Sequence, residues 1–201
     1  MNQKLTDGWG TSRVAMAMLK MDKTIKVRKA IETDEALLLH WANDIEVRKN
    51  SFSAEKILPS EHHNWFQNCQ NDPNKLLLIA TQKNGCPIGQ IRFDLLDKKG
   101  KDDGRQAMIS ISLDRCARGH GIGIELVKLG LESLEKKWGE NIEAIAEVLQ
   151  NNVASNSCFE KAGFKKEKAT LREDEKDLRG NVNRWRWLNK KAKERGQTEN
   201  Q

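Results

Sequence analysis

The chain has 201 residues, enough for one domain of the commonest size with short extensions. Its 35 Lys and Arg and 29 Asp and Glu residues give a formal net charge of +6, but the two signs are interleaved, which argues against a nucleic-acid partner. No apolar run approaches the length of a membrane-spanning helix, so we expect a cytoplasmic protein without a membrane partner. The four cysteines stand far apart, with no Cys-x-x-Cys pair, so we expect neither a metal site nor a disulfide scaffold.

The first part of the chain predicts a strand followed by two helices. Residues 24–30 alternate polar and apolar side chains, which is the period of a half-buried strand. Thr33 and Asp34 then supply capping oxygens and an acidic first turn for a helix that includes Trp41. A second helix is expected over about residues 60–68, before a proline.

Three consecutive strands are expected next, and they predict an antiparallel meander. Residues 76–81 form a compact apolar run, and Asn84-Gly85 is a strong hairpin signal before a strand over residues 88–95. After a polar turn, residues 107–113 again alternate between the two faces of a strand.

The second part of the chain alternates helices with strands. One apolar helical face is predicted by residues that recur at spacings of three and four, namely Ile124, Val127, Leu131, Leu134 and Trp138. Beyond Gly139 we expect a buried strand over 142–149, a helix over 153–161 and two strands over 164–171 and 183–188. This order of elements predicts an α+β (mixed α/β) layered fold.

A glycine-rich turn joins the strand that ends at Leu113 to the long helix. Residues 118–123 read Arg-Gly-His-Gly-Ile-Gly. Glycines leave backbone N–H groups free, and a helix N-terminus adds roughly half a positive charge, so the turn is suited to a pyrophosphate. On this pattern alone it could also be a purely structural turn. It is not a Walker loop, since no Gly-Lys-Ser/Thr follows, and the upstream meander does not suit a dinucleotide fold.

A second motif follows downstream, and the pair of motifs resembles a known family. The second motif reads Asn152-x-x-Ser155-x-x-x-Phe159-Glu160-Lys161-x-Gly163-Phe164. Together with Arg118-x-x-Gly121-x-Gly123, it resembles the acetyl-CoA signature of the GCN5-related N-acetyltransferases (GNATs) over about residues 24–188. The resemblance implies a mostly antiparallel seven-stranded sheet, splayed between its fourth and fifth strands, with helices on both faces. We place this domain at residues 23–189, between an extension over 1–22 and a disordered polar tail over 190–201.

The resemblance also implies that acetyl-CoA is the co-substrate and indicates which residues hold it. These are Leu113, Arg118, Gly119, His120, Gly121, Ile122, Gly123, Asn152, Ser155, Phe159 and Lys161. The amides of residues 119–123 are expected to bind the pyrophosphate, with Arg118 adding charge. Asn152 is expected to bond the pantetheine arm, and an N–H near Leu113 to polarise the thioester carbonyl.

Four residues are candidates for proton transfer. Glu147, in a Glu-Val stretch similar to that of ribosomal-protein acetyltransferases, is the first candidate for the base, and His62 is the second. Glu147 could instead be a strand carboxylate paired with a basic residue. Many relatives carry a Tyr acid where this chain has Phe159, and the chain contains no Tyr. Ser155, Cys158 or a water could therefore protonate the leaving thiolate, or the thiolate could leave unaided, and we favour the water.

The acceptor half of the chain carries aromatic and basic residues suited to a nucleotide sugar. The candidate acceptor-binding residues are Trp41, Arg48, His62, Trp65 and Arg92. Three motifs resemble the acetyltransferases of pseudaminic acid biosynthesis, namely Trp41-x-Asn43-Asp44, His62-x-x-Trp65-Phe66 and Gly89-x-x-Arg92. That resemblance implies a UDP-linked 4-amino-4,6-dideoxy sugar as acceptor. Residues 6–14 also resemble the closing stretch of a nucleotide-sugar hydrolase of that pathway, as a remnant of a fusion or simply as a frayed extension.

Other interpretations stay open at this point. Either tryptophan could be a core residue, and Glu147-Val148 favours a protein N-terminal or lysine acetyltransferase. The missing Tyr and the basic charge allow a non-catalytic acyl-CoA-binding module that has kept the fold. Residues 184–187 could form a homodimer face or alternate in and out of the sheet, and we expect alternation.

Overall fold

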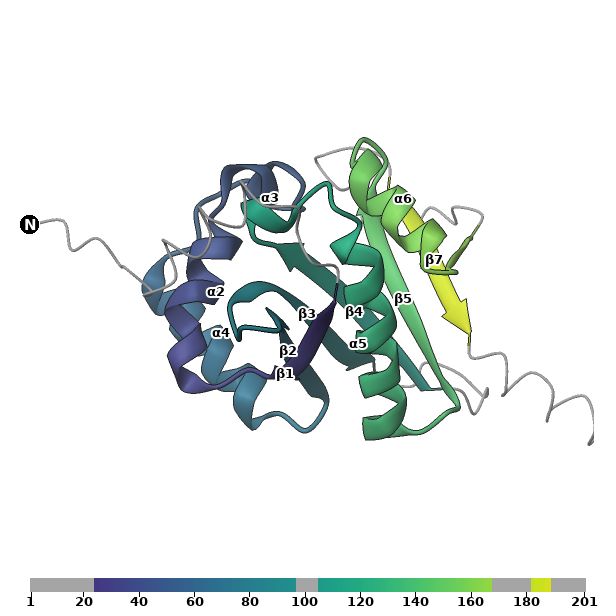
Figure 1. The fold of residues 1–201 in the computed structure, drawn as a ribbon, viewed down its shortest axis with the longest axis horizontal. Coiled ribbons are helices and arrows are strands. Elements are labelled where there is room, and N and C mark those ends of the chain that lie inside the picture. Colours follow the sequence, from purple (N-terminus) through teal and green to yellow (C-terminus); the bar gives the residue numbers. More distant parts are fainter. Residues whose placement is uncertain (1–23, 97–104, 168–181, 189–201) are drawn as a thin grey trace, which may run out of the picture.

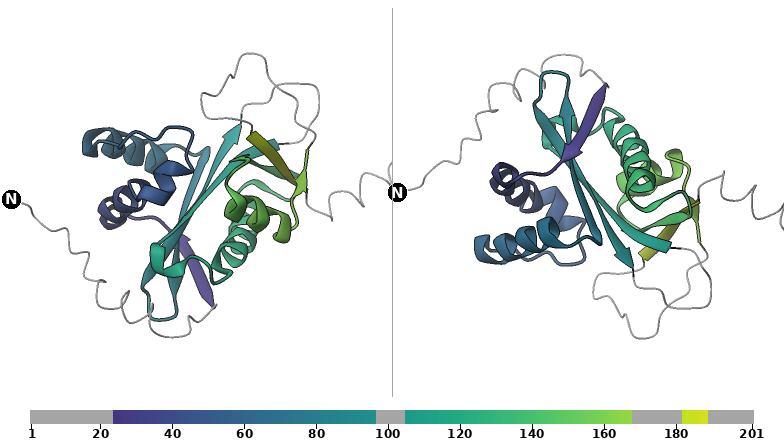
Figure 2. Two further views of the ribbon diagram at one scale, coloured as in Figure 1. Left: turned by 90° about the horizontal axis from the view of Figure 1, so that it is seen from above. Right: turned by 90° about the horizontal axis from the view of Figure 1, so that it is seen from below.

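The computed structural model describes residues 24–96, 105–167 and 182–188. Within them, a seven-stranded sheet has helices on both faces (Figures 1 and 2). The strands are β1 (Ile25–Lys29), β2 (Lys75–Gln82), β3 (Pro87–Leu96), β4 (Arg105–Leu113), β5 (Ile142–Leu149), β6 (Lys165–Lys166) and β7 (Val182–Leu188). The helices are α2 (Glu35–Ala42), α3 (Ile45–Lys49), α4 (Pro59–Asn71), α5 (Ile122–Trp138) and α6 (Val153–Lys161), with 3-10 turns η1 (Glu32–Asp34) and η2 (Arg115–Ala117).

The extension over 1–22, the tail over 190–201 and residues 168–171 of the strand expected over 164–171 lie outside the described residues. None of the described helices is long and apolar enough to cross a bilayer.

The sheet topology confirms the predicted fold class. The strand order is β1-β2-β3-β4-β5-β7-β6, and every neighbouring pair is antiparallel except β4 and β5, which are parallel. The parallel pairing extends only from Arg105 opposite Ile142 to Met108 opposite Ile145. Beyond this point residues 109–113 and 146–149 diverge, which is the splay expected between the fourth and fifth strands.

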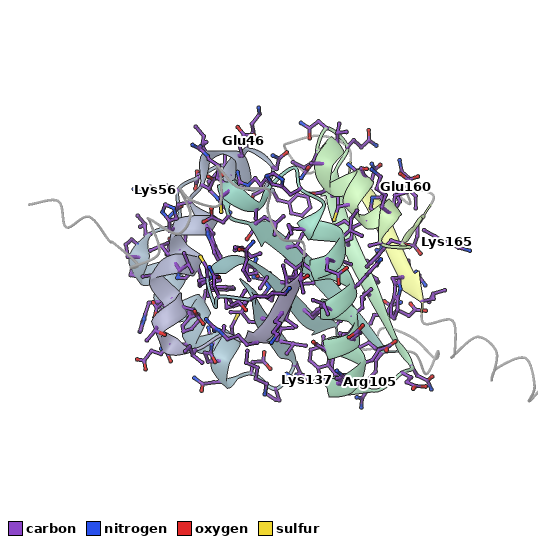
Figure 3. All side chains as sticks on the ribbon, in the orientation of Figure 1. Glu46, Lys56, Arg105, Lys137, Glu160 and Lys165 are labelled. Carbon is purple, nitrogen blue, oxygen red and sulfur yellow. The ribbon has the colours of Figure 1, made fainter. Side chains whose placement is uncertain are left out.

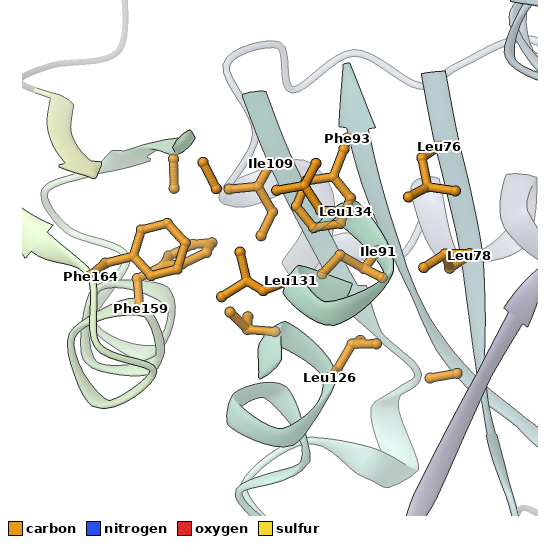
Figure 4. Close-up of a cluster of buried hydrophobic side chains, with 14 of the residues drawn as sticks. Leu76, Leu78, Ile91, Phe93, Ile109, Leu126, Leu131, Leu134, Phe159 and Phe164 are labelled. Atoms are coloured by element: carbon orange, nitrogen blue, oxygen red, sulfur yellow. The ribbon is translucent and has the colours of Figure 1, made fainter. Parts of the chain in front are cut away.

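Two apolar clusters hold the layers together. The larger one fills the space between the sheet and helices α5 and α6, and includes Phe93, Leu126, Leu134 and Phe159 (Figure 4). The smaller one lies under α2 and α4 on the opposite face (Figure 2). Both faces of the sheet are covered at β2, so the β2 side chains are buried on both sides. The continuous apolar run of this strand is typical of such burial.

The buried face of α5 differs from the predicted one by a small rotation. Val127, Leu131 and Leu134 are buried as expected, but Ile124 and Trp138 are only partly buried. Ile122 and Leu126 complete the core side instead.

Helix α3 was not predicted, because its five residues are too few for a helical period to show. The Asn43-Asp44 pair ends α2 and starts α3. The Asp44 Oδ1 accepts bonds from the N–H groups of Glu46 and Val47, at 3.0 and 3.3 Å. The Asn43 side chain both accepts from and donates to the Ile57 backbone, so it closes the loop that carries α3.

The last strand alternates as predicted. Trp185 is buried and Trp187 packs against the larger core. Arg184 and Arg186 lie on the opposite face, where they approach carboxylates of β5 and of Glu167.

Candidate active site

The turn before α5 has the backbone needed to bind an anion. Gly119 and Gly121 adopt φ of 79° and 80°, a left-handed conformation that favours glycine. A Cβ at either position would meet no protein atom within 4 Å, so the space beside them is open. No backbone carbonyl of the described residues accepts a hydrogen bond from the N–H groups of residues 119–123. His120 is exposed, whereas Ile122 and Gly123 are buried, so only the outer part of the turn can contact a ligand through side chains.

Arg118 points away from this turn. Its Nη1 lies 2.8 Å from the Asp44 Oδ1, and its Nε donates to the Leu113 carbonyl at 3.0 Å. Its Nη2 is buried and has no partner among the described residues. Burial alone would raise the pKa of the Asp44 carboxyl, but the Arg118 guanidinium and two backbone donors lower it, so the pair is ionised. The Arg118 charge is therefore engaged by Asp44, whereas we expected it to bind the pyrophosphate.

Leu113 presents its backbone to the gap between β4 and β5. The next residue, Asp114, donates its N–H to the Ile88 carbonyl of β3 at 2.9 Å. Because successive N–H groups of a strand point to opposite sides, the Leu113 N–H points away from β3 and into the splay. The gap can therefore accept an extended ligand beside β4.

Asn152 lies at the far side of the gap, as the N-cap of α6. Its Oδ1 accepts from the Ser155 N–H at 3.1 Å, which leaves its amide NH₂ group available for a ligand. Ser155 is half-buried in the first turn of α6, and Lys161 is exposed at the end of that helix.

Two other residues of α6 lie inside the fold. Phe159 is 3% exposed and packs edge-on against Phe164, at 5.0 Å between ring centroids. Phe159 is therefore a core residue in this structure, whereas we expected it to contact the cofactor. Burial also raises the pKa of the Cys158 thiol to about 11, so the thiol is protonated at neutral pH. A Cβ on Gly123 would lie 3.0 Å from the Cys158 Sγ, so this glycine lets α5 and α6 approach closely.

Glu147 lies on β5 beyond the last β4–β5 pair, with its side chain half-buried. Its carboxylate is 3.8 Å from the Arg184 Nη1, on the face of the sheet opposite α5 and α6. At this distance the contact is a loose ion pair, so the carboxylate is available for a second partner.

His62, Trp65 and Arg92 come together under α4. The His62 and Trp65 rings are 4.9 Å apart, and the Arg92 guanidinium lies 5.4 Å from the Trp65 ring. Arg92 also donates to Asp94 at 2.7 Å. His62 is 3% exposed, and neither ring nitrogen has a hydrogen-bond partner among the described residues. Burial lowers the pKa of His62, and Glu35 raises it only in part, so the ring is neutral and closed off from solvent.

The role predicted for Trp41 is wrong in this structure. Trp41 is 2% exposed and belongs to the smaller core. Its indole Nε1 donates to the buried Asp114 Oδ2 at 2.8 Å, so its polar edge is already used. Asp114 also caps η2 by accepting from the Cys116 N–H. Sequence reasoning missed Asp114, although a carboxylate directly after a strand and before a glycine turn is a signal for a cap.

A pocket of about 530 Å³ opens where α3 faces the end of β5. It is lined by Ile45, Arg48, Lys49, Ala54, Leu149 and Asn151. The Arg48 guanidinium is held by the Ala42 carbonyl at 2.6 Å and by the Ser51 hydroxyl at 3.1 Å. The pocket therefore has two cations and apolar walls, and it adjoins the splay. Glu46 of α3 marks this end of the molecule in Figure 3, opposite Arg105 and Lys137.

Gln90 was not predicted as a site residue. Its Nε2 donates to the Ser112 Oγ at 3.2 Å, and its Oε1 is buried with no partner in the part of the chain that the structure describes. The Gln90 and Ser112 side chains lie on the face of the sheet that carries Arg92, and Ser112 is one residue before the end of β4.

Comparison with known proteins identifies the family. The family described as acetyltransferase (GNAT) domain matches residues 25–165, which is most of the chain. The chain belongs to this family. Residues 25–165 are therefore a GNAT acetyltransferase domain, and the turn before α5 and the splay have the geometry to hold an acetyl-CoA donor. No cluster of His, Cys, Asp or Glu within residues 24–96, 105–167 and 182–188 could hold a metal ion.

One relative and several solved structures are similar to most of this chain. Over 151 residues the chain is 28% identical to an uncharacterized protein of Methanocaldococcus jannaschii, a match that covers 73% of this chain but 29% of that protein. A domain from the same organism has 24% identity and a TM-score of 0.64, over 82% of this chain and 97% of that one. Spermidine N-acetyltransferase from Vibrio cholerae, in complex with CoA and spermine, has 15% identity and a TM-score of 0.70, over 84% and 97%. An aminoglycoside acetyltransferase in complex with coenzyme A has 20% identity and a TM-score of 0.67, over 87% and 99%.

Proposed function

We propose that this GNAT enzyme acetylates the 4-amino group of a UDP-linked 4-amino-4,6-dideoxy sugar, by direct attack of the amine on the thioester of acetyl-CoA. The observation that carries the proposal is the pocket beside the splay, which combines Arg48 and Lys49 with apolar walls and has no carboxylate among its lining residues. Two phosphates suit the cations, and a 6-deoxy sugar suits Ile45 and Leu149.

The charge of this pocket argues for an anionic acceptor. Spermine is a polycation, and a polycation placed beside Arg48 and Lys49 would meet repulsion in a partly desolvated site. The polyamine bound in the spermidine N-acetyltransferase structure is thus a poor guide to the acceptor of this chain. The same reasoning disfavours a basic peptide.

The donor would be held mainly by main chain. The free N–H groups of residues 119–123 are suited to the pyrophosphate, and the Asn152 amide to the pantetheine arm. The Leu113 N–H, pointing into the splay, is placed to polarise the thioester carbonyl and to stabilise the charge that develops on its oxygen.

Glu147 is the better candidate for the base. It lies past the last β4–β5 pair, is partly exposed and has only a loose ion pair. His62, in contrast, is closed off from solvent and lies among α4 side chains. A carboxylate within reach of the amine, directly or through one water, would accept the proton that the amine loses on attack.

The proposal is tested by following thiol release from acetyl-CoA with three kinds of acceptor. These are the UDP-4-amino sugar, the same amino sugar without UDP, and a panel of peptides with free N-termini or lysines. We expect the highest kcat/KM with the UDP-linked sugar. Equal values with and without UDP would remove the nucleotide from the proposal, and a peptide preference would show a protein acetyltransferase instead. Coenzyme A binding without transfer to any amine would indicate a binding module.

A further inference from the structure

The corner between α2 and α3 is tied to the end of β4 by two side-chain links. The first is the bond from the Trp41 indole to Asp114, at 2.8 Å, inside the core. The second is the ion pair of Asp44 with Arg118, at 2.8 Å and closer to the surface. Both links join the segment that lines the acceptor pocket to the segment that would hold the donor.

Arg118 contacts both the strand beside the donor site and the helix beside the acceptor pocket. Its Nε holds the carbonyl of Leu113, the residue whose N–H points into the splay. Its Nη1 holds Asp44, the N-cap of the helix that supplies Ile45, Arg48 and Lys49 to the pocket. With side-chain exposures of 28% for Arg118 and 15% for Asp44, the pair is partly shielded from solvent, so it is stronger than an open surface pair.

We infer that Arg118 is a positioning residue that couples the two substrate sites, and that it is not a phosphate ligand. It holds α3 at a fixed position relative to the Leu113 peptide group. Its planar fork makes this possible, because Nε and Nη1 can serve two acceptors at a fixed angle, which a lysine cannot do. The inference rests on the proposal that the α3 pocket takes the acceptor. The donor pyrophosphate is then left to the backbone N–H groups of residues 119–123.

Two substitutions and a matched control test the inference. Arg118→Ala removes the link, and Asp44→Asn removes its charge while keeping an N-cap, since Asn caps helices as well as Asp does. Arg115→Ala is the control, because it deletes an exposed arginine of the same segment for which no side-chain bond is described. Each variant is measured for the KM of the acceptor, for CoA affinity by calorimetry and for melting temperature.

We expect Arg118→Ala and Asp44→Asn each to raise the acceptor KM about tenfold, while CoA affinity stays within about twofold of the Arg115→Ala value. The double variant should be no worse than either single one, since both remove the same contact. A loss of CoA affinity in Arg118→Ala with an unchanged acceptor KM would overturn the inference and make Arg118 a phosphate ligand. Additive effects of the two substitutions would also overturn it.

A second measurement does not depend on the identity of the acceptor. Amide hydrogen exchange of residues 45–49 should be faster in Arg118→Ala and in Asp44→Asn, and unchanged in Arg115→Ala. If wild-type enzyme does not use the UDP-linked sugar, the proposed function fails, and the KM comparison is made with the amine preferred in the acceptor panel. Unchanged exchange at α3 in both variants would refute the coupling whatever the acceptor is.

Discussion

Replacing Gly121 by Val should weaken CoA binding while leaving the domain folded. Gly121 has a φ of 80°, and a Cβ there would point into open space beside the free N–H groups of the turn. A residue with a side chain is strained in this conformation by about 1–2 kcal/mol, which a domain of this size tolerates. Blocking two charge-assisted bonds to a phosphate, at about 1.5–3 kcal/mol each, would weaken CoA binding by roughly 10²- to 10⁴-fold.

The matched control is Gly139→Val at the other end of α5. Gly139 has φ of 94° and ψ of 168°, a region essentially restricted to glycine, and a Cβ there would also meet no atom within 4 Å, so the backbone strain is at least as large but lies far from the turn. Calorimetric titration with CoA and urea denaturation are measured on both variants. A folded Gly121→Val protein that binds CoA like wild type would refute the assignment of the turn. Equal loss of affinity in both variants would show that strain, and not the blocked site, is responsible.

Three further changes test other parts of the site. Glu147→Gln should lower kcat by roughly 10²- to 10⁴-fold with unchanged CoA affinity, and a drop of only a few-fold at every pH would make Glu147 structural. Trp41→Phe removes the bond to buried Asp114 and should destabilise the protein by about 2 kcal/mol in urea denaturation, whereas an unchanged midpoint would show that the bond contributes nothing. Burial lowers the pKa of His62 in the folded state, so folding favours the neutral ring. The free energy of unfolding is therefore unaffected by His62 protonation above the unfolded-state pKa of about 6.5, and it decreases as pH falls below that value. His62→Leu should therefore lose less stability than wild type between neutral and acidic pH, and equal losses would contradict the burial argument.

Local sequence patterns were sufficient for most of the fold. Asn84-Gly85 marked the β2–β3 hairpin, and the alternation of residues 107–113 marked β4. The two glycine-containing motifs located the turn and α6, because their physical requirement is a backbone conformation that the residue type itself determines.

The side-chain roles were harder to predict, because they depend on partners that are distant in the sequence. Trp41 suits a ligand face as well as a core, and only its bond to Asp114, 73 positions away, decides between them. Arg118 was placed correctly by its motif, but its direction depends on Asp44 in another layer. Helix α3 was missed for a different reason, since its five residues show no period.

The gap between β4 and β5 leaves two strand edges inside the molecule instead of at its border. Such edges have unpaired N–H and C=O groups, and most proteins protect them with charges, bulges or covering elements. If the pantetheine arm of the donor binds in the splay as proposed, its amide groups would pair with these edges and cover them. Donor binding would then stabilise the fold. At donor concentrations near a hundred times Kd, binding alone adds about 2.7 kcal/mol to the free energy of unfolding. The lifetime of the protein in the cell would therefore rise and fall with the supply of acetyl-CoA.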